Sequence, residues 1–463
     1  MNVTLFGAAS TVTGSAYLLQ SRTACIMVDF GVFQGGKTEE AKNRKFPLIP
    51  VSKLDAVVIT HAHLDHTGRL PLLVKNGYSG PIYATEATID VARLILLDSV
   101  KVQDHDLKRD NRKRLRKGQS PLTPLFTEED VHKVFDQFKA IPYNQKVDVA
   151  EGCQVRVREA GHILGSVSVE LSVEENGTRR VILFSGDIGP HDMAILKDPE
   201  PFASADLVFM ESTYGDHDHR TLEETLKEGW EIVGRAVKTK GKILVPSFAV
   251  GRTQQLLYYL ARAMHNDRLP SIPVYLDSPM AIEATKIYLK HRELYDDEAA
   301  QLMQEGVFKG DLSGVHVSET AEDSMALNEV EGPCMIIAGA GMCNAGRILH
   351  HLRHNLWKPE TTVMIVGYQG NGSLGRRLLD GVPKVRIFGE EIAVKAHVAS
   401  LGGLSAHAGQ SDLVNWFGAV AASRPRLVLS HGEDRGRIPL AKIIRSRFGI
   451  EPVLPEFGQV ITI

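Results

Sequence analysis

The residues most suited to chemistry in this chain lie in the segment 60–66, of sequence THAHLDH, which holds His61, His63, Asp65 and His66. The run 54–60 leading into it is apolar and rich in β-branched residues, which predicts a buried strand. A strand that ends in such a loop places imidazoles and a carboxylate at the edge of a sheet. Neutral imidazole nitrogens and carboxylate oxygens are the ligands that Zn²⁺ prefers in catalytic sites. The pattern therefore predicts a metal site rather than a polar turn.

Three more side chains complete this donor set. His162, Asp187 and His431 each follow a strand-like run, and glycines flank the first two and let the backbone come close. The alternation within the histidine loop sends its side chains toward two different points. The resulting sets are His61, His63 and His162; Asp65, His66 and His431; and Asp187, whose two oxygens can bridge the others. Two metal ions about 3.5–4 Å apart neutralise charge on the attacking and leaving oxygens, as phosphodiester hydrolysis requires.

Glu211, His407 and Asp29 remain outside the donor sets. A leaving alkoxide needs a proton, and an imidazole held by a carboxylate, such as His407 held by Glu211, can supply it near neutral pH. The alternative for Glu211 is a carboxylate at the start of a helix. Asp29 ends an apolar strand-like run at 24–30. It either orients the histidine loop or closes an Asx-turn.

Composition bounds the class of protein. The 463 residues are enough for about two to three domains, and 43% hydrophobic content is typical of a globular chain. The net charge of −3 argues against a protein that coats nucleic acid, so a polyanion would need a local basic site. The block 107–117 has seven basic side chains and one acidic one. It is either a solvated helix face or mobile loop, or a contact for a phosphate backbone.

The cellular setting follows from cysteine usage and from the apolar runs. The four cysteines are far apart in sequence and form no CxxC pair, which predicts a reduced protein without disulfides. No signal peptide is visible at the N-terminus, and no apolar run approaches the length of a membrane span. We therefore expect a cytoplasmic protein that does not contact a membrane.

The pattern of strands changes at about residue 210. Four strand–loop–helix units follow in series between 242 and 377, which indicates a parallel sheet and an α/β domain. Their loops are rich in Gly, Ser and Arg and lead into helix N-termini, which favour phosphate. No loop has the GxxxxGK[ST] signature, so no nucleotide cofactor is expected. The first pattern resumes with a strand predicted at 392–398. We therefore predict a host domain at 1–209 and 391–463, interrupted by an inserted domain at 210–390.

The order of these motifs resembles a known family. Asp29, the HAHLDH segment, His162 and Asp187 are similar to the four motifs of the metallo-β-lactamase superfamily. ESTYG at 211–215, LSAH at 404–407 and SHGE at 430–433 resemble the three further motifs of the β-CASP nucleases. That group includes the endonuclease of eukaryotic mRNA 3′-end processing and related bacterial and archaeal ribonucleases. The resemblance covers essentially the whole chain.

The resemblance implies a fold and an activity. The fold would be an α/β metallo-β-lactamase αββα sandwich with an inserted parallel-sheet β-CASP domain. The activity would be that of a ribonuclease with two Zn²⁺ per chain, acting on single-stranded RNA in RNA processing or decay. Metal-bound hydroxide would attack phosphorus, Asp65 would position or deprotonate it, and His407 would protonate the leaving 3′ oxygen. Products would have 5′-phosphate and 3′-hydroxyl ends. DNA-directed relatives typically lack the last histidine, so the presence of His431 favours RNA.

The resemblance also extends to the substrate side. The segments 246–252 and 367–378 look like substrate-side loops of the family, which makes Ser247, Arg252 and Arg376 candidate phosphate contacts. RNA would lie in a cleft between host and insert, and a homo-oligomer is compatible with the family. Two rival functions remain, a small-molecule metallohydrolase of thioesters or lactones and a non-catalytic scaffold of an RNA-processing complex.

Overall fold

The structure is a computed structural model that describes residues 1–266, 268, 270–306, 315–370 and 372–463. The chain forms two compact units. The first comprises Met1–His191, Asp198–Asp218 and His407–Ile463, and the second comprises Asp192–Lys197 and His219–Ala406. Asn371, in the predicted substrate-side segment 367–378, lies outside the described residues. The predicted domain limits at 209/210 and 390/391 stay a prediction.

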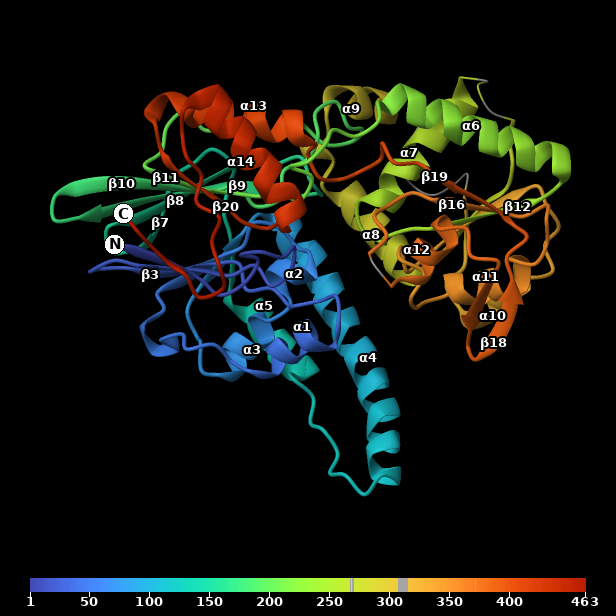
Figure 1. The fold of residues 1–463 in the computed structure, drawn as a ribbon, viewed down its shortest axis with the longest axis horizontal. Coiled ribbons are helices and arrows are strands. Elements are labelled where there is room, and N and C mark those ends of the chain that lie inside the picture. The colour runs from blue at the N-terminus through green and yellow to red at the C-terminus, as the bar shows by residue number, and fades with distance from the viewer. Residues whose placement is uncertain (267, 269, 307–314, 371) are drawn as a thin grey trace. The chain divides into compact units, whose positions relative to one another are not determined.

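Two mixed sheets stack face to face in the first unit (Figure 1). One has the strand order β21-β1-β2-β3-β4-β5-β6 and the other the order β20-β11-β10-β9-β8-β7. The strands of the first are β1 (Asn2–Leu5), β2 (Tyr17–Gln20), β3 (Cys25–Val28), β4 (Ala56–Val58), β5 (Ile82–Ala84), β6 (Phe138–Ala140) and β21 (Val460–Thr462). Those of the second are β7 (Val147–Ala150), β8 (Cys153–Glu159), β9 (Val167–Glu175), β10 (Thr178–Phe184), β11 (Leu207–Met210) and β20 (Arg426–Leu429).

Helices cover the outer faces of both sheets. Figure 1 shows α13 and α14 on one side of the paired sheets and α3, α4 and α5 on the other. These helices are α1 (Lys37–Ala41), α2 (Leu64–Thr67), α3 (Leu70–Lys75), α4 (Glu86–Arg116), α5 (Glu128–Gln137), α13 (Gln410–Val420) and α14 (Asp434–Phe448). The predicted αββα sandwich is confirmed.

Alternating side chains build the core on each face of the sheets. In β2, Leu19 lies in the apolar layer between the two sheets, while its neighbour Leu18 lies in the layer under α3, α4 and α5. Successive residues of a strand point to opposite faces, so one strand supplies both layers. A third layer packs β11 and β20 against α13 and α14 through residues such as Met210 and Phe417. The burial of all three layers fixes the strand register.

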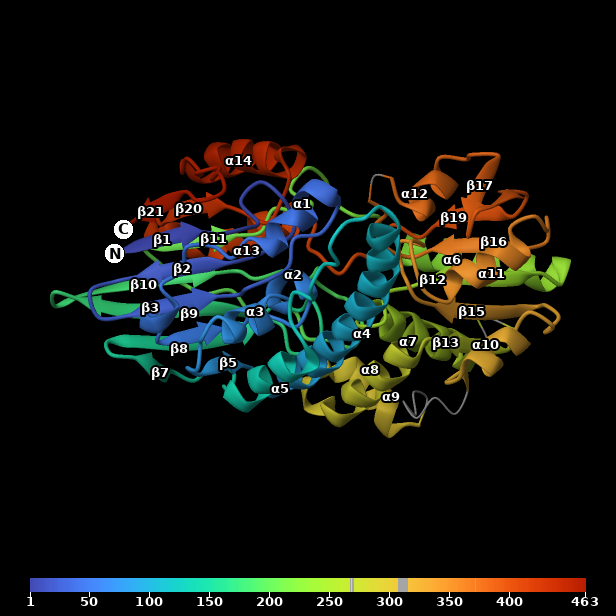
Figure 2. The ribbon, with the colours of Figure 1, turned by 90° about the horizontal axis from the view of Figure 1, so that it is seen from below.

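The second unit contains a parallel sheet with the order β14-β13-β15-β12-β16-β19 (Figure 2). Its strands are β12 (Lys242–Pro246), β13 (Val274–Asp277), β14 (His316–Val317), β15 (Cys334–Ala338), β16 (Thr362–Ile365) and β19 (His397–Ser400), beside the antiparallel pair β17 (Lys384–Ile387) and β18 (Glu390–Ala393). Its helices are α6 (Leu222–Thr239), α7 (Arg252–His265), α8 (Pro279–Lys290), α9 (Asp297–Gln304), α10 (Ala321–Ala326), α11 (Ile348–Asn355) and α12 (Leu374–Leu379). The predicted α/β character is confirmed.

Two expectations about individual elements were wrong. The strand predicted at 392–398 is two strands, because β18 pairs locally with β17 and β19 then joins β16 in the parallel sheet of the second unit. The helix α4 continues to Arg116 and includes nearly all of the basic block, so the alternative of a mobile loop at 107–117 is wrong. A two-residue hairpin turn joins β9 to β10, with Asn176 and Gly177 both at positive φ as a type I′ turn requires.

Candidate active site

The candidate site lies where parallel strands of the first unit end. Strands β3 and β4 run parallel in one sheet, and β10, β11 and β20 run parallel in the other. The carboxyl ends of neighbouring parallel strands meet at one edge, so the residues that follow them come together. The predicted residues that follow these five strands are Asp29, the histidine loop with His61, Asp187, Glu211 and His431. His162 comes from the loop after β8, and His407 precedes α13.

Two glycines allow the loops to approach one another. A Cβ on Gly31 would lie 1.5 Å from the Asp65 carbonyl oxygen, and one on Gly189 would lie 1.9 Å from that of Gly161. Neither position can therefore hold a larger residue without moving the backbone. At Gly189, which follows Asp187, this agrees with the close approach that the sequence predicted from the glycines flanking His162 and Asp187.

The histidine loop divides between two groups because a helix begins within it. His63 is the residue before α2, and Asp65 and His66 lie in that helix. His63 Nδ1 is 3.1 Å from both His61 Nε2 and His162 Nε2. These three imidazole nitrogens face one point, as the sequence predicted for the first set.

The second set meets on the other side of Asp187. His66 Nε2 is 3.3 Å from His431 Nε2, and His431 Nε2 is 3.6 Å from Asp65 Oδ2. Asp187 lies between the sets, with Oδ2 3.5 Å from His61 Nε2 and Oδ1 3.4 Å from His66 Nε2. The donor atoms of His61, His63, His162 and Asp187 lie within 4.8 Å of one another, and so do those of Asp65, His66 and His431. Each cluster could hold a metal ion.

The chemistry of Asp187 fits a cation at this place. Its side chain is 2% exposed, and its Oδ1 accepts no well-aligned hydrogen bond among the described residues, although His431 Nδ1 and His66 Nε2 lie 3.3 and 3.4 Å from it. A buried carboxylate oxygen without a donor is costly unless it is paired or coordinates a metal. Imidazole-rich sets with carboxylates suit Zn²⁺ as a ligand environment. The residues present therefore fit bound metal ions, although their roles as ligands stay a prediction.

Electrostatics keep four of these donors in the forms that bind cations, while His66 differs: burial lowers its pKa, but Asp187 and Asp29 outweigh burial and hold that pKa well above its usual value. Burial, together with the neighbouring His66, holds the pKa of His61 well below its usual value, and burial also lowers the pKa of His63. Burial opposes ionisation of Asp65, but the hydrogen bond with His431 and the charges of His66 and His431 together outweigh it and lower the pKa of Asp65 to about 2. The pKa of Asp187 lies well below its usual range, because the surrounding imidazoles outweigh its burial. Near neutral pH the first two are neutral and the carboxylates are ionised.

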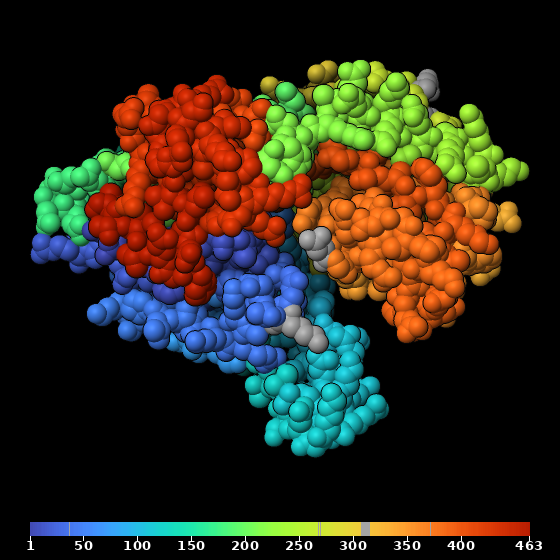
Figure 3. Space-filling view, in the orientation of Figure 1, coloured from blue at the N-terminus to red at the C-terminus, as the bar shows by residue number. Residues whose placement is uncertain are grey.

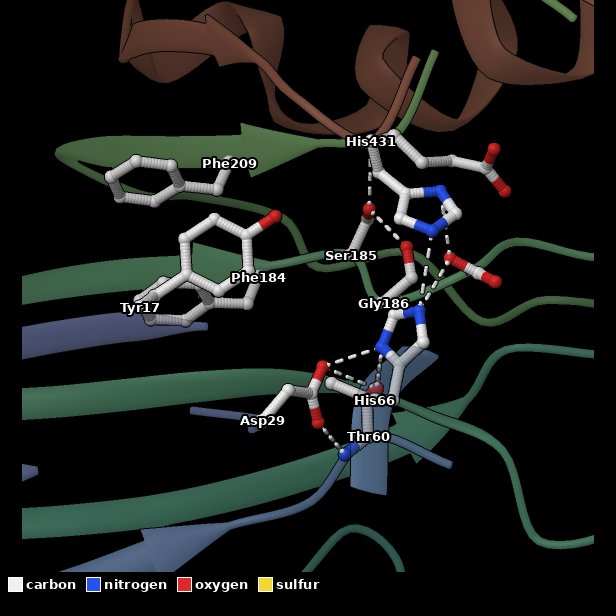
Figure 4. A pocket seen from close by; sticks show the side chains of 11 residues that line it. Tyr17, Asp29, Thr60, His66, Phe184, Ser185, Gly186, Phe209 and His431 are labelled. Atoms are coloured by element: carbon white, nitrogen blue, oxygen red, sulfur yellow. Dashed lines mark hydrogen bonds and ion pairs between the residues drawn. The ribbon is translucent and has the colours of Figure 1, made fainter. Parts of the chain in front are cut away.

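Asp29 orients the histidine loop, as Figure 4 shows. Its Oδ2 lies 2.7 Å from His66 Nδ1 and also accepts the Thr60 hydroxyl, while Oδ1 accepts the Thr60 backbone N–H at 2.8 Å. With Nδ1 held by a carboxylate, Nε2 of His66 is directed into the site. A carboxylate behind a ligating imidazole typically fixes the tautomer and raises its basicity.

Backbone strain accompanies two of these positions. Asp29 has φ 56° and His431 has φ 46°, both in the left-handed region that non-glycine residues rarely adopt. Two backbone hydrogen bonds hold His431 in this conformation. Its N–H donates to Ala8 O at 2.6 Å, and its carbonyl oxygen accepts the Ser212 N–H at 3.1 Å. Such strain persists only where surrounding contacts impose it, and it concentrates at functional sites.

His407 and Glu211 form a pair beside the metal-ligand clusters. His407 Nδ1 is 3.2 Å from Glu211 Oε1, and His407 Nε2 is 4.0 Å from Asp187 Oδ2. Glu211 is 1% exposed, and its Oε1 also accepts the Ile188 N–H at 2.7 Å. Burial lowers the pKa of His407, but Glu211 outweighs it and raises that pKa to about 9. No helix begins at Glu211, so the alternative of a helix-start carboxylate is wrong.

Sequence reasoning missed three supporting residues. The Thr60 hydroxyl donates to Asp29 Oδ2 at 2.8 Å and lies 3.1 Å from His61 Nδ1, so it connects the orienting carboxylate to the first histidine. Thr213 Oγ1 lies 3.3 Å from His431 Nδ1. Tyr17 bonds Ser430 at 2.9 Å, and its ring packs against Phe184 behind the site. Only Thr60, a hydroxyl at the strand end next to the first histidine, has a position in the sequence that could have indicated its role.

The predicted phosphate contacts lie in the second unit. Ser247 is 1% exposed and accepts the Thr253 hydroxyl at 3.0 Å. Arg252 is 6% exposed and donates to Gln255 at 2.8 Å. Arg376 is exposed and pairs with Asp380 at 2.8 Å. Burial of the first two side chains gives no support to a phosphate contact, and all three assignments stay predictions.

Comparison with known domain families finds three matches along the chain. A metallo-beta-lactamase superfamily domain matches residues 18–182, and a Beta-Casp domain matches residues 253–378. A Zn-dependent metallo-hydrolase RNA specificity domain matches residues 391–455. The three matches occur in the order that the motifs indicated.

Individual proteins are similar over most of the chain. Ribonuclease TTHA0252 of Thermus thermophilus is 39% identical over 463 residues, which cover 100% of both chains. Transcription termination factor FttA of Pyrococcus horikoshii is 30% identical over 479 residues, covering 98% of this chain and 70% of that protein. Among solved structures, a protein of unknown function from Enterococcus faecalis has a TM-score of 0.58 at 15% identity, covering 100% of this chain and 99% of that one. The last likeness concerns the fold alone.

Proposed function

Because this chain belongs to the β-CASP group of the metallo-β-lactamase superfamily, whose members are metal-dependent hydrolases, we propose that it is a ribonuclease that cleaves single-stranded RNA with two zinc ions. One observation carries this proposal. The two oxygens of Asp187 face separate clusters of imidazole and carboxylate donors, and the His407–Glu211 pair lies beside them. A thioester hydrolase of the same fold would have no need of that additional proton donor, because a thiolate leaves more readily than an alkoxide.

Two bound zinc ions would supply an activated water and neutralise charge that develops on the phosphate. The first ion would be held by His61, His63 and His162, the second by Asp65, His66 and His431, and Asp187 would bridge them. The ionised Asp65 carboxylate, in the second set, would accept a hydrogen bond from the attacking water and orient it.

His407 would protonate the leaving oxygen. Its pKa of about 9 keeps the imidazole protonated at neutral pH. Metal ions held at Asp187 would place positive charge near His407, and the Glu211 carboxylate would offset that charge. With Nδ1 engaged by Glu211, Nε2 holds the proton that is transferred. The products would have 5′-phosphate and 3′-hydroxyl ends.

The matched RNA specificity domain and the ribonuclease relative support RNA over DNA as the substrate. The four cysteines are buried free thiols, in keeping with the cytoplasmic location that we propose. No helix within the described part of the chain is both long and apolar enough to span a membrane.

The test uses protein purified without chelator. End-labelled single-stranded RNA, matched DNA, a thioester and a lactone are incubated with it, before and after chelation and after zinc is restored. RNA cleavage that is lost on chelation and restored by zinc is expected. Turnover of the thioester or lactone without nuclease activity would identify the small-molecule rival, and no turnover of any substrate would favour the scaffold. His132→Ala is a matched control, because that histidine is exposed on α5.

A further inference from the structure

The helix α4 connects the candidate active site to a part of the first unit that the proposed function does not use. The hydroxyls of Thr85 and Thr88, at its start, both donate to the Gly165 carbonyl at 2.8 Å. Gly165 lies in the same loop as His162. The first half of the helix is packed into the core, with buried residues up to Val100. The helix therefore begins at a fixed place beside the site.

The second half of α4 has no buried residue after Val100. Figures 1 and 3 show this half and the segment after it standing out from the rest of the first unit. Two amide side chains tie the returning segment to the helix. Asn111 exchanges two hydrogen bonds with the backbone of Leu122, at 2.7 and 2.9 Å, and Gln103 accepts from Leu125 N–H at 2.7 Å. The projection, residues 101–126, is thus a built element, which we call the basic arm.

The two faces of the basic arm differ in character. The face toward the returning segment contains the half-buried Leu107, Asn111 and Arg114. The opposite face, at the spacing i, i+1, i+4, i+5 and i+8 of a helix, is formed by exposed basic side chains. They are Lys108, Arg109, Arg112, Lys113 and Arg116.

Internal pairing leaves most of this charge uncompensated. Arg109 lies 3.0 Å from Asp106 and Lys113 lies 3.9 Å from Asp110, and exposed pairs of this kind are weak. None of the ion pairs between described residues involves Lys108, Arg112 or Arg116, which follow one another at i, i+4 and i+8. Like charges at this spacing destabilise a helix. The helix dipole favours Arg116 in the last turn but does not reach Lys108 two turns earlier.

The charge is local and contrasts with the rest of the chain. The block 107–117 has seven basic residues and one acidic residue, whereas the whole chain has 53 basic and 56 acidic residues. The block is therefore +6 and the remainder −9. The block contains no aromatic residue on which a base could stack. Such a surface complements a polyanion through its phosphates and without preference for sequence.

We propose that the outer face of the basic arm binds the phosphate backbone of the RNA substrate away from the scissile bond. This inference rests on the proposed ribonuclease function. At 1.5 Å per residue, the 20 residues from Thr88 to Lys108 place the first of these charges about 30 Å from the Gly165 contact. That distance corresponds to about nine nucleotides of a stacked strand at 3.4 Å per phosphate. Long RNA would reach both the site and the arm, and a four-nucleotide RNA would not.

The test is the salt dependence of RNA binding by the triple variant Lys108→Gln, Arg112→Gln and Arg116→Gln. Gln keeps a good helix propensity at exposed positions. Binding of a 30-nucleotide and a four-nucleotide RNA is measured between 50 and 200 mM salt, on zinc-loaded protein in a His407→Ala background that slows cleavage. Loss of three phosphate contacts lowers the slope of log affinity against log salt by about 2 for single strands. Between 50 and 200 mM salt, the RNA affinity of the protein with the unsubstituted arm should therefore fall about 20-fold more than the RNA affinity of the triple variant.

The matched control replaces Lys227, Arg235 and Lys238 on the exposed face of α6 by Gln, which removes the same charge elsewhere. We expect the arm variant, and not the α6 variant, to lose at least about tenfold in affinity for the long RNA at 50 mM salt. Affinity for the short RNA should be unchanged. An unchanged slope for the arm variant, or an equal loss for long and short RNA, would overturn the proposal.

Two further measurements distinguish RNA from a membrane surface as the partner, and the basic arm from the active site. If the arm variant keeps its RNA affinity and slope but loses binding to vesicles containing phosphatidylserine, the partner is an anionic membrane surface and the RNA assignment is refuted. Cleavage of the 30-nucleotide RNA by protein with His407 intact reports separately on the proposed function. If that RNA is bound with the predicted slope but never cut, the ribonuclease proposal fails while the arm proposal stands.

Discussion

Replacing Glu211 by Gln is expected to lower the pH at which activity disappears, because Glu211 sets the pKa of His407. Burial lowers the pKa of the His407 imidazole, yet the Glu211 carboxylate 3.2 Å from Nδ1, with smaller contributions from Asp187 and Asp65, outweighs burial and raises that pKa to about 9. The amide of Gln has nearly the same shape and can still accept the Ile188 N–H. The substitution therefore removes the charge and keeps the bond from Ile188, while the longer contact from the Thr213 N–H to Oε2, at 3.3 Å, is lost.

The magnitude follows from the protonated fraction of His407. A group with a pKa of about 9 is about 99% protonated at pH 7 and about 76% at pH 8.5. Glu211 makes the largest contribution that raises this pKa, ahead of Asp187 and Asp65. If its removal brought the pKa to the ordinary value of about 6.5, about 24% of the imidazole would be protonated at pH 7 and about 1% at pH 8.5. Because the proposed role requires the protonated form, Glu211→Gln should lose about fourfold in rate at pH 7 and about 80-fold at pH 8.5.

The assay is kcat/KM on single-stranded RNA between pH 6 and 10, for the unsubstituted protein and for Glu211→Gln, His407→Ala and the control His132→Ala. The unsubstituted protein should lose activity as pH rises through about 9. His407→Ala should lose roughly 10²–10⁴-fold, the usual contribution of a general acid, and should show no alkaline limb from this group. Metal content is measured for each protein, so that loss of metal is distinguished from loss of the proton donor.

Two results would refute this reasoning. If Glu211→Gln keeps an alkaline limb near 9 with an unchanged rate, Glu211 does not set the protonation of His407. If His407→Ala loses metal ions while His431→Ala keeps them, the roles of the two histidines have been assigned the wrong way round.

Three further predictions concern the metal ions and the substrate. Elemental analysis should find about two divalent ions per chain in the unsubstituted protein and in His407→Ala, and fewer in His431→Ala, which removes one of the three donors of the second set. Thr60→Val, which removes the hydroxyl between Asp29 and His61, should weaken metal binding by about 10–100-fold in a chelator competition while the circular dichroism spectrum stays unchanged. RNA oligomers should be cleaved faster than DNA oligomers of the same sequence, and equal cleavage rates for both would count against the RNA assignment.

Much of the site could be predicted from the sequence because its donors follow short apolar strands. The sequence of the histidine loop already separates His61 and His63 from Asp65 and His66, and the start of α2 at Leu64 produces that separation in space. The interpretation of Asp29 as an orienting carboxylate agrees with its bonds to Thr60 and His66. These inferences needed only local spacing and the rule that parallel strands end at one edge.

Other features depended on contacts that no local pattern specifies. The block 107–117 is so highly charged that its sequence is compatible with either a helix face or a loop. The hydrogen bonds between the Asn111 side chain and the Leu122 backbone, which support the helix, join residues eleven positions apart and leave no local pattern. The segment 392–398 has the composition of one strand, yet pairing with β17 and then β16 divides it. The segment 246–252 looks like a substrate-side loop of the family, which made Arg252 a candidate phosphate contact, yet burial beside Gln255 decides its environment.

Cleavage of single-stranded RNA in ¹⁸O-labelled water tests the central claim most directly. If water attacks phosphorus at the strand-end site and His407 protonates the leaving 3′ oxygen, each cut should place one ¹⁸O in the 5′-phosphate of the downstream fragment. The other new end should be an unlabelled 3′-hydroxyl, and chelation should abolish the reaction. A 2′,3′-cyclic phosphate or 3′-phosphate product, or cleavage that persists after the metal ions are removed, would contradict this mechanism.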